Sequence, residues 1–167
     1  MLIVALGDIH DRFTNLDRVL ADIHLQNPDT VICTGDLSTS QMLIHLASAF
    51  DGPEIHLVLG NLDDEMDIKA TIDREKLLKV YYHGLTGRLT LDKKRVAFAH
   101  KPKDAAPLLE EQVFDVVFYG HTHNAKIEQH DNTLFVNPGD IQGRFGGTPS
   151  YVTYDTATSV ATLHKVD

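Results

Sequence analysis

The chain is poor in cysteine, and a single cysteine excludes an internal disulfide. Cys33 lies in the apolar run of residues 31–33, which indicates a buried structural thiol rather than a nucleophile. Such a cysteine-poor chain suits a reducing compartment. Residues 1–6 lack the basic segment and the small-residue cleavage site of a signal peptide. We therefore expect a cytoplasmic protein.

Long apolar runs and an excess of positive charge are also missing. No run approaches the roughly 18 residues of a membrane span, so we expect no membrane partner. The formal net charge of −9 argues against general nucleic-acid binding, which depends on basic patches. Residues 7–12 lack the second and third glycines of a dinucleotide-binding turn. At 167 residues with 43% hydrophobic content, the chain is expected to form one domain, residues 1–167.

The first half of the sequence predicts strands that alternate with helices. Apolar residues at helical spacing (Leu16, Val19, Leu20 and Ile23) indicate a helix over Thr14–Gln26, with Thr14 as its N-cap. Alternation of this kind predicts a parallel sheet covered on both faces. The expected strands are Leu2–Ala5, Thr30–Cys33 and Glu54–Leu59, and the other expected helices are Ser40–Phe50 and Asp63–Lys79.

The second half shifts toward antiparallel structure. One helix, Ala105–Gln112, is expected after Pro102. Together the two halves predict a two-layered β-sandwich of mixed parallel and antiparallel strands, flanked by helices. Three hairpins are expected, pairing Arg88–Leu91 with Arg95–Ala99, Lys126–Gln129 with Thr133–Val136, and Tyr151–Tyr154 with Val160–His164.

Five predicted strands each end beside residues that commonly bind metals. Ligands in open α/β sheets bind beyond the carboxyl ends of the strands, so these side chains are expected to converge. Any one Gly-Asp or Gly-His pair is ordinary strand-to-loop sequence, whereas the ordered set of five is not. Imidazole suits transition metals and carboxylate suits harder cations, which indicates a catalytic metal site. The candidates are Asp8, His10, Asp36, Asn61, His100, His121 and His123.

Seven ligands exceed the needs of one tetrahedral ion and fit two. Asp36 is the central candidate for a bridging carboxylate. Two ions about 3.5–4 Å apart can hold both the attacking and the leaving oxygens at a phosphorus centre, and they acidify a bound water. Two divalent cations and two carboxylates leave a net local positive charge, so the site can attract an anion although the protein is acidic.

The ordered motifs Gly7-Asp8-Ile9-His10, Gly35-Asp36, Gly60-Asn61, His100 and Gly120-His121-Thr122-His123 resemble those of the calcineurin-like metallophosphoesterases. The short length and Asn137-Pro138-Gly139 resemble the compact bacterial and archaeal phosphodiesterase branch, which shares its fold with a subunit of the eukaryotic retromer coat. The resemblance implies a four-layer αββα sandwich with two mixed β-sheets flanked by helices. It also implies that Asp8, His10, Asp36 and His123 hold one metal, that Asp36, Asn61, His100 and His121 hold the other, and that Asp36 bridges them.

Four departures from the family pattern concern residues around the ligands. Leu62 replaces a histidine that often follows the asparagine and assists the leaving group, a kind of help worth about 10²–10⁴-fold in rate. Lys101-Pro102 replaces the end of a His-Gly-His pattern, Asp11 replaces a glycine, and Asp140 replaces the usual serine or threonine after Asn-Pro-Gly.

Beyond the ligands, Arg12 is the principal candidate for contacting substrate phosphate, since arginine suits bidentate phosphate contacts. Lys101, Lys103 and Arg144 are further candidates, against the alternative of solvated surface residues. Asp11, Asp63 and Asp64 could replace the missing acid, although helix capping or simple exposure is the favoured explanation for them. His83 is a candidate distal acid, and the other histidines are expected to be structural or on the surface.

The leading hypothesis is a dimetal phosphoesterase, with diesters favoured, that attacks a small phosphate ester with a metal-bridging hydroxide. Asp36, Asn61, His100 and Arg12 are its expected catalytic residues. Manganese is favoured, with nickel, zinc, iron or cobalt as alternatives, and assembly into a homo-oligomer is left open. The competing hypothesis is a weakly active or inactive scaffold of the same fold that binds a partner protein. Leu62 and the altered surroundings motivate it.

Overall fold

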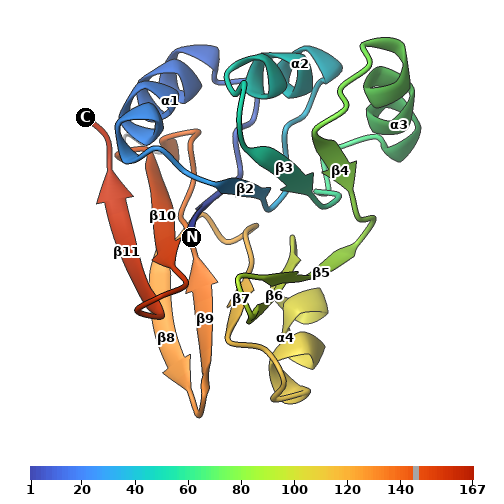
Figure 1. Cartoon of the computed structure of the whole chain (residues 1–167). Coiled ribbons are helices and arrows are strands. Elements are labelled where there is room, and N and C mark those ends of the chain that lie inside the picture. Colours follow the sequence, from blue (N-terminus) through green and yellow to red (C-terminus); the bar gives the residue numbers. More distant parts are fainter. Residues whose placement is uncertain (145–146) are drawn as a thin grey trace.

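Two β-sheets pack face to face in the computed structural model, which describes residues 1–144 and 147–167 (Figure 1). Six strands form the first sheet, in the order β11-β10-β1-β2-β3-β4, and five form the second, in the order β5-β6-β7-β9-β8. The strands of the first sheet are β1 (Leu2–Leu6), β2 (Thr30–Cys33), β3 (Glu54–Leu57), β4 (Val80–Tyr82), β10 (Ser150–Asp155) and β11 (Val160–Lys165). Those of the second are β5 (Thr86–Leu91), β6 (Lys94–Ala99), β7 (Val116–Phe118), β8 (Lys126–His130) and β9 (Thr133–Asn137).

Both sheets are mixed, as the resemblance implied. Strands β1 to β4 are parallel to one another, and β10 joins β1 in antiparallel pairing. The three predicted hairpins are confirmed as the antiparallel pairs β5–β6, β8–β9 and β10–β11. The second half is less antiparallel than the sequence suggested, because β7 pairs parallel to both β6 and β9.

Helices cover the outer face of each sheet. Figure 1 places three helices over the first sheet and the fourth below the second, which gives four layers in the order α, β, β, α. The first sheet is therefore covered on both faces, as predicted, with helices on one face and the second sheet on the other. The helices are α1 (Phe13–Gln26), α2 (Ser40–Ser48), α3 (Glu65–Arg74) and α4 (Pro102–Glu110).

Alternation along β1 shows how the layers are held together. Ile3 and Ala5 point into the apolar cluster between the two sheets, where Phe98 and Phe118 also lie. Val4 and Leu6 point the other way, into the cluster beneath the helices. Successive side chains of a strand face opposite sides, so an uninterrupted apolar strand is buried on both faces. A third cluster packs α4 against the second sheet.

The first helix follows its predicted apolar face but not its predicted start. Leu16, Val19, Leu20 and Ile23 are all buried. The helix begins at Phe13, one residue earlier than expected, and Arg12 occupies the N-cap without a side-chain hydrogen bond. Thr14 is therefore not the N-cap; it lies within the first turn.

Two other boundaries differ from prediction near the candidate site. Helix α3 is shorter than Asp63–Lys79, and the side chain of Asp64 caps it by accepting a hydrogen bond from the Asp67 amide. Strand β3 ends at Leu57 rather than Leu59, although the Val58 and Leu59 amides still donate to the carbonyls of Cys33 and Gly84 in the neighbouring segments.

Candidate metal centre

The structure brings all seven predicted ligands to neighbouring strand ends. Their segments follow β1, β2, β3, β6 and β7, which are parallel within their own sheets and present carboxyl ends at a common edge. The loops are joined to each other as well as to the strands. The Asp8 amide donates to the Gly35 carbonyl, and the Gly120 amide donates to the His100 carbonyl.

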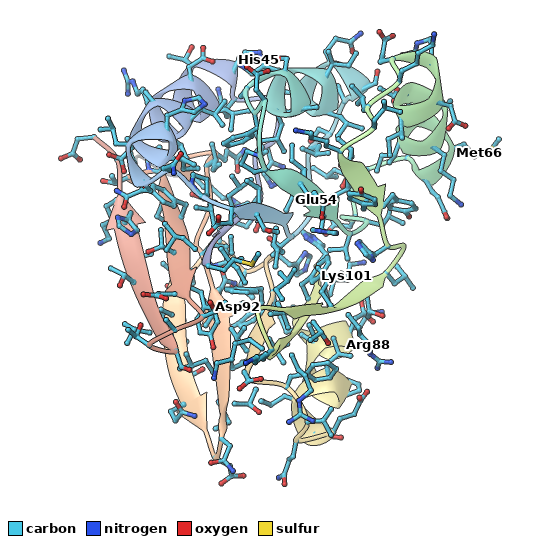
Figure 2. All side chains as sticks on the ribbon, in the orientation of Figure 1. His45, Glu54, Met66, Arg88, Asp92 and Lys101 are labelled. Carbon is cyan, nitrogen blue, oxygen red and sulfur yellow. The ribbon has the colours of Figure 1, made fainter. Side chains whose placement is uncertain are left out.

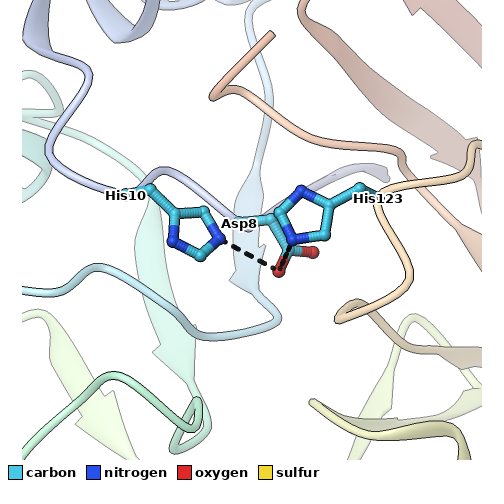
Figure 3. Close-up of side chains that lie close together, drawn as sticks. All are labelled: Asp8, His10 and His123. Carbon is cyan, nitrogen blue, oxygen red and sulfur yellow. Dashed lines mark ion pairs between the residues drawn. The ribbon is translucent and has the colours of Figure 1, made fainter. Parts of the chain in front are cut away.

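The first half of the centre is formed around Asp8. Its Oδ1 lies 3.7 Å from Nε2 of His10 and 3.7 Å from Nε2 of His123 (Figure 3). The two imidazoles stack, with ring centroids 4.9 Å apart. Two nitrogens from distant segments therefore point at one oxygen of a fully buried carboxylate.

Asp36 connects this half to the second one. Its Oδ2 lies 3.6 Å from Nε2 of His10 and 3.5 Å from Nε2 of His100. The same His100 nitrogen lies 2.9 Å from Oδ1 of Asn61 and 3.3 Å from Nδ1 of His121. The other Asp36 oxygen is already held by the Leu62 amide, at 2.9 Å. One oxygen of Asp36 is therefore directed between two groups of ligand atoms.

The hydrogen bonding of these atoms fits bound cations. Oδ1 of Asp8 and Nε2 of His10 are buried and have no hydrogen-bond partner within the described part of the chain. Nδ1 of His100 lies 2.8 Å from the Thr34 carbonyl and must donate to it, which leaves Nε2 of the neutral ring as an acceptor facing the Asn61 oxygen. A metal ion would satisfy these facing lone pairs. Two groups have ligand atoms within 4.8 Å of one another, Asp8–His10–His123 and Asp8–Asp36–His100.

The surroundings shift the pKa values of the ligand imidazoles in different directions. The nearby Asp8 carboxylate raises the pKa of His10 against the opposing effect of burial. Burial lowers the pKa of His100, but the hydrogen bond and charge of Asp36 outweigh it and raise that pKa. Burial opposes ionisation of Asp36, yet its hydrogen bonds with His100 and Leu62 lower its pKa. Burial and the neighbouring His100 lower the pKa of His121. The carboxylate is thus kept ionised, as a metal ligand must be.

The ligands themselves carry unusual backbone conformations. Asp8, His10, Asp36, His121 and His123 have φ values of 51°, 49°, 56°, 70° and 59°. Left-handed conformations are uncommon outside glycine, although Asp and His tolerate them better than most residues. Each costs on the order of 1–3 kcal/mol, and such strain concentrates at functional sites.

The motif glycines mostly serve close approach rather than positive φ. A Cβ on Gly60 would lie 2.0 Å from the Asp36 amide nitrogen, and one on Gly120 would lie 2.8 Å from Oδ2 of Asp8. Of the glycines that precede a ligand, Gly35 alone has positive φ, at 98°. These glycines therefore make room for a crowded centre, while most of the strained positions are the ligands that follow them.

Two carboxylates that support the ligands were given no such role by sequence reasoning. Asp63 accepts hydrogen bonds from the amides of Asp36, Ser38 and Gly60, at 2.8–2.9 Å. Asp140 lies 2.6 Å from Nδ1 of His123. The sequence offered one signal for these roles: Asp63 follows Gly-Asn-Leu, and Asp140 follows Asn-Pro-Gly. That signal does not show which backbone amide or imidazole ring each carboxylate contacts.

The structure also places the other predicted site residues. Arg12 is exposed and lines a cavity of about 560 Å³ with Asp11 and Gln142. Arg144 lines a second cavity of about 410 Å³, which also borders His123. His83 is not brought to the centre, because its Nε2 lies 3.0 Å from Nδ1 of His56. Lys101 and Lys103 precede and begin α4, with Lys101 half-buried and Lys103 exposed.

Comparison with known proteins agrees with this fold. The family model of the calcineurin-like phosphoesterase superfamily domain matches residues 1–159. The chain therefore belongs to the calcineurin-like phosphoesterase superfamily. Members of this family use divalent metal ions, and the candidate metal-binding residues here are consistent with that.

Individual relatives agree along the whole length. The chain is 25% identical to phosphodiesterase MJ0936 of Methanocaldococcus jannaschii over 162 residues, which cover 93% of each protein. Among solved structures, it is similar to an archaeal phosphodiesterase, with a TM-score of 0.87, 23% identity, and coverage of 99% of this chain and 100% of the other. It is also similar to Vps29 of Entamoeba histolytica, with a TM-score of 0.70, 18% identity, and coverage of 100% and 99%.

Proposed function

We propose that this chain is a metal-dependent phosphodiesterase that hydrolyses a small phosphate diester at the centre formed by the seven ligands. The placement of one Asp36 oxygen between Nε2 of His10 and Nε2 of His100 carries the proposal, because a shared carboxylate is what a two-ion centre requires. The phosphodiesterase relative supports diesters over monoesters.

The residues divide into two sets around Asp36. Asp8, His10 and His123 would hold one ion with it, and Asn61, His100 and His121 would hold the other. A pair of divalent cations, when bound, supplies positive charge for phosphate oxygens and acidifies a water for attack at phosphorus. Manganese is our first choice of metal, with nickel, zinc, iron and cobalt as alternatives.

The protein's own residues hold the ligands in position and supply charge for phosphate binding. Asp36 is held by the Leu62 amide through one oxygen, so its other oxygen keeps a fixed aim. Asn61 and His100 are proposed to contact or orient the reacting phosphate from the second set. Arg12 follows the His10 segment, lines a neighbouring cavity, and is proposed to bind a non-bridging phosphate oxygen.

Leu62 limits the substrates that can react. The side chain is 52% exposed and cannot donate a proton to a leaving group. We therefore expect aryl diesters, whose phenoxides leave with little protonation, to react faster than alkyl diesters. Matched aryl and alkyl diesters that react at equal rates would contradict this part of the proposal.

A scaffold with little or no turnover is the second candidate function. Leu62 and Met66 are exposed apolar side chains near the Asn61 loop, at 52% and 82%, and Met66 projects from α3 away from the body of the protein (Figure 2). Similarity to Vps29 keeps this alternative open. Presence of every metal ligand at the centre favours the enzyme.

The test is hydrolysis of bis(4-nitrophenyl) phosphate after chelation and separate readdition of manganese, nickel, zinc and iron, with Asp36→Asn as control. Metal-dependent turnover that the variant lacks is the expected result. A folded, metal-loaded protein that turns over nothing with any metal would overturn the proposal in favour of the scaffold.

The setting of this activity is proposed from the sequence. We expect a cytoplasmic enzyme of one domain, residues 1–167, without general affinity for nucleic acid. In the part of the chain that the structure describes, none of the helices has both the length and the apolar character needed to cross a membrane. A homo-oligomer is compatible with this function.

A further inference from the structure

Asp140 and His123 form a carboxylate–imidazole pair beside the candidate centre. Oδ2 of Asp140 lies 2.6 Å from Nδ1 of His123, and the two side chains are only 7% and 13% exposed. An ionised carboxylate can only accept hydrogen bonds, so Nδ1 must carry the proton in this pair. The opposite nitrogen, Nε2, is the one that faces Oδ1 of Asp8.

The position of this carboxylate is fixed from several directions. Its Oδ1 accepts a hydrogen bond from the Gly143 amide, at 3.2 Å. The two residues that follow it, Ile141 and Gln142, donate through their amides to the carbonyls of Gly7 and Asp8, at 3.3 and 3.1 Å. The Asp140 turn is therefore attached to the same segment that supplies the first ligand.

Helix α1 fixes the same turn from the other side. The side-chain amide of Asn15 donates to the carbonyls of Ile141 and Gln142, at 3.1 and 3.0 Å. Asp140 also accepts a hydrogen bond from the Ser150 amide through its own carbonyl, at 3.0 Å. Its carboxylate therefore has a defined place relative to both Asp8 and His123.

We propose that Asp140 is a positioning residue that fixes the tautomer and the aim of His123, and that it thereby strengthens metal binding by Asp8, His10 and His123. Imidazole ligands commonly donate their second N–H to a carboxylate or carbonyl, and loss of such a partner costs about 10–100-fold in metal affinity. This inference rests on the proposed metal centre but not on any turnover.

The other ligand imidazoles are oriented differently. His100 donates to the neutral carbonyl of Thr34. Nδ1 of His121 lies 3.3 Å from the His100 ring nitrogen, and the residue is exposed. Among the described ligands, His123 is the one whose far nitrogen meets a carboxylate at hydrogen-bond distance, so Asp140 acts on one half of the centre.

Two measurements on the purified protein test the proposal. Proton–nitrogen correlation spectra of the metal-free protein at one fixed pH report which ring nitrogen of His123 carries the proton. Calorimetric titration with manganese reports the number of ions that bind and the affinity of the protein for each. Asp140→Ala should shift His123 toward a mixture of tautomers and weaken one of two ions by about 10–100-fold. Asp140→Asn, whose amide oxygen can still accept from Nδ1, should recover part of both effects.

Asp17→Ala is the matched control, because Asp17 pairs with His45 at the same 2.6 Å distance between two helices. It should change the His45 signals alone and leave both ions at wild-type affinity. An Asp140→Ala protein that is folded, keeps Nδ1 of His123 protonated and binds two ions as tightly as wild type would overturn the proposal. So would equal weakening of both ions by Asp140→Ala. Neither measurement depends on hydrolysis. A protein without activity would therefore contradict the proposed phosphodiesterase function but would not affect this test of Asp140.

Discussion

Oδ2 of Asp63 accepts a hydrogen bond from the backbone amide of Asp36, at 2.9 Å. The same oxygen accepts from the Gly60 amide at 2.8 Å, and Oδ1 accepts from the Ser38 amide at 2.9 Å. One carboxylate therefore joins the loop that carries the central Asp36 to the loop that carries Asn61. The relative position of the two proposed halves of the centre depends on it.

We expect Asp63→Ala to lower the free energy of unfolding by about 2–3 kcal/mol, since bonds to a charged group are worth about 1.5–3 kcal/mol and are not additive. It should also weaken metal binding, because the Asp36 and Asn61 loops lose their shared acceptor. Urea unfolding of the metal-free protein and manganese titration measure the two effects.

Asp64→Ala is the control for this prediction. Its carboxylate caps α3 through the Asp67 amide, so its loss should cost about 1 kcal/mol and leave the metal affinity unchanged. Equal metal binding by both variants would show that Asp63 stabilises the loops without shaping the centre.

Gly60→Ala should disrupt the centre more than its small size suggests. The added Cβ would lie 2.0 Å from the Asp36 amide nitrogen and 2.2 Å from its Oδ1, so the Asp36 loop must move. We expect a loss of about 1–3 kcal/mol in stability and at least a tenfold loss of activity. Gly52→Ala meets no atom within 4 Å and should be neutral in both measurements. A Gly60→Ala protein with wild-type activity would show that the Asp36 loop has freedom absent from this structure.

Sequence patterns predicted the parts of this molecule that depend on local periodicity. The uninterrupted apolar run that begins at Leu2 and the helical spacing from Leu16 to Ile23 located β1 and the buried face of α1. The order of the motifs also predicted that the seven ligands lie close together, because parallel strands bring their carboxyl ends to one edge of a sheet.

Those patterns could not predict interactions between segments that lie far apart in the sequence. Asp63 reads as a helix-capping residue in sequence, yet α3 is capped by Asp64 and Asp63 turns back to loops about 25 residues away. His83 reads as a candidate acid, yet pairing of β4 with β3 places it against His56. Both roles depend on which strand ends beside which loop, and that is a property of the tertiary fold.

Leu62→His should restore proton donation to the leaving group. We expect hydrolysis of an alkyl diester to rise about 10–100-fold, while hydrolysis of an aryl diester changes little, because only the alkoxide needs a proton. The side chain is 52% exposed, so histidine fits without repacking. Leu62→Gln supplies polarity without a titrating proton and should leave both rates near wild type. Equal gains with glutamine and histidine would exclude general-acid help as the cause.

His56 and His83 form a pair between β3 and the segment that follows β4. Nδ1 of His56 lies 3.0 Å from Nε2 of His83, and the His56 ring stacks on Tyr81. Burial lowers the pKa of both, and the neighbouring His83 lowers that of His56 further. Glu54, 3.6 Å from Nε2 of His56, opposes part of this effect.

These lowered pKa values predict that the pair destabilises the fold in acid. Below about pH 6.5 the unfolded chain takes up protons that the folded pair resists, so the free energy of unfolding falls as pH decreases through that value. Urea midpoints of the metal-free protein at about pH 8 and about pH 5.5 measure the loss. His83→Gln should make the loss smaller, because one resisting group is gone. Glu54→Gln should make it larger, because the carboxylate that favours protonated His56 is gone. Identical pH dependence in all three proteins would assign acid sensitivity to other groups, among them His121, whose pKa is lowered by burial.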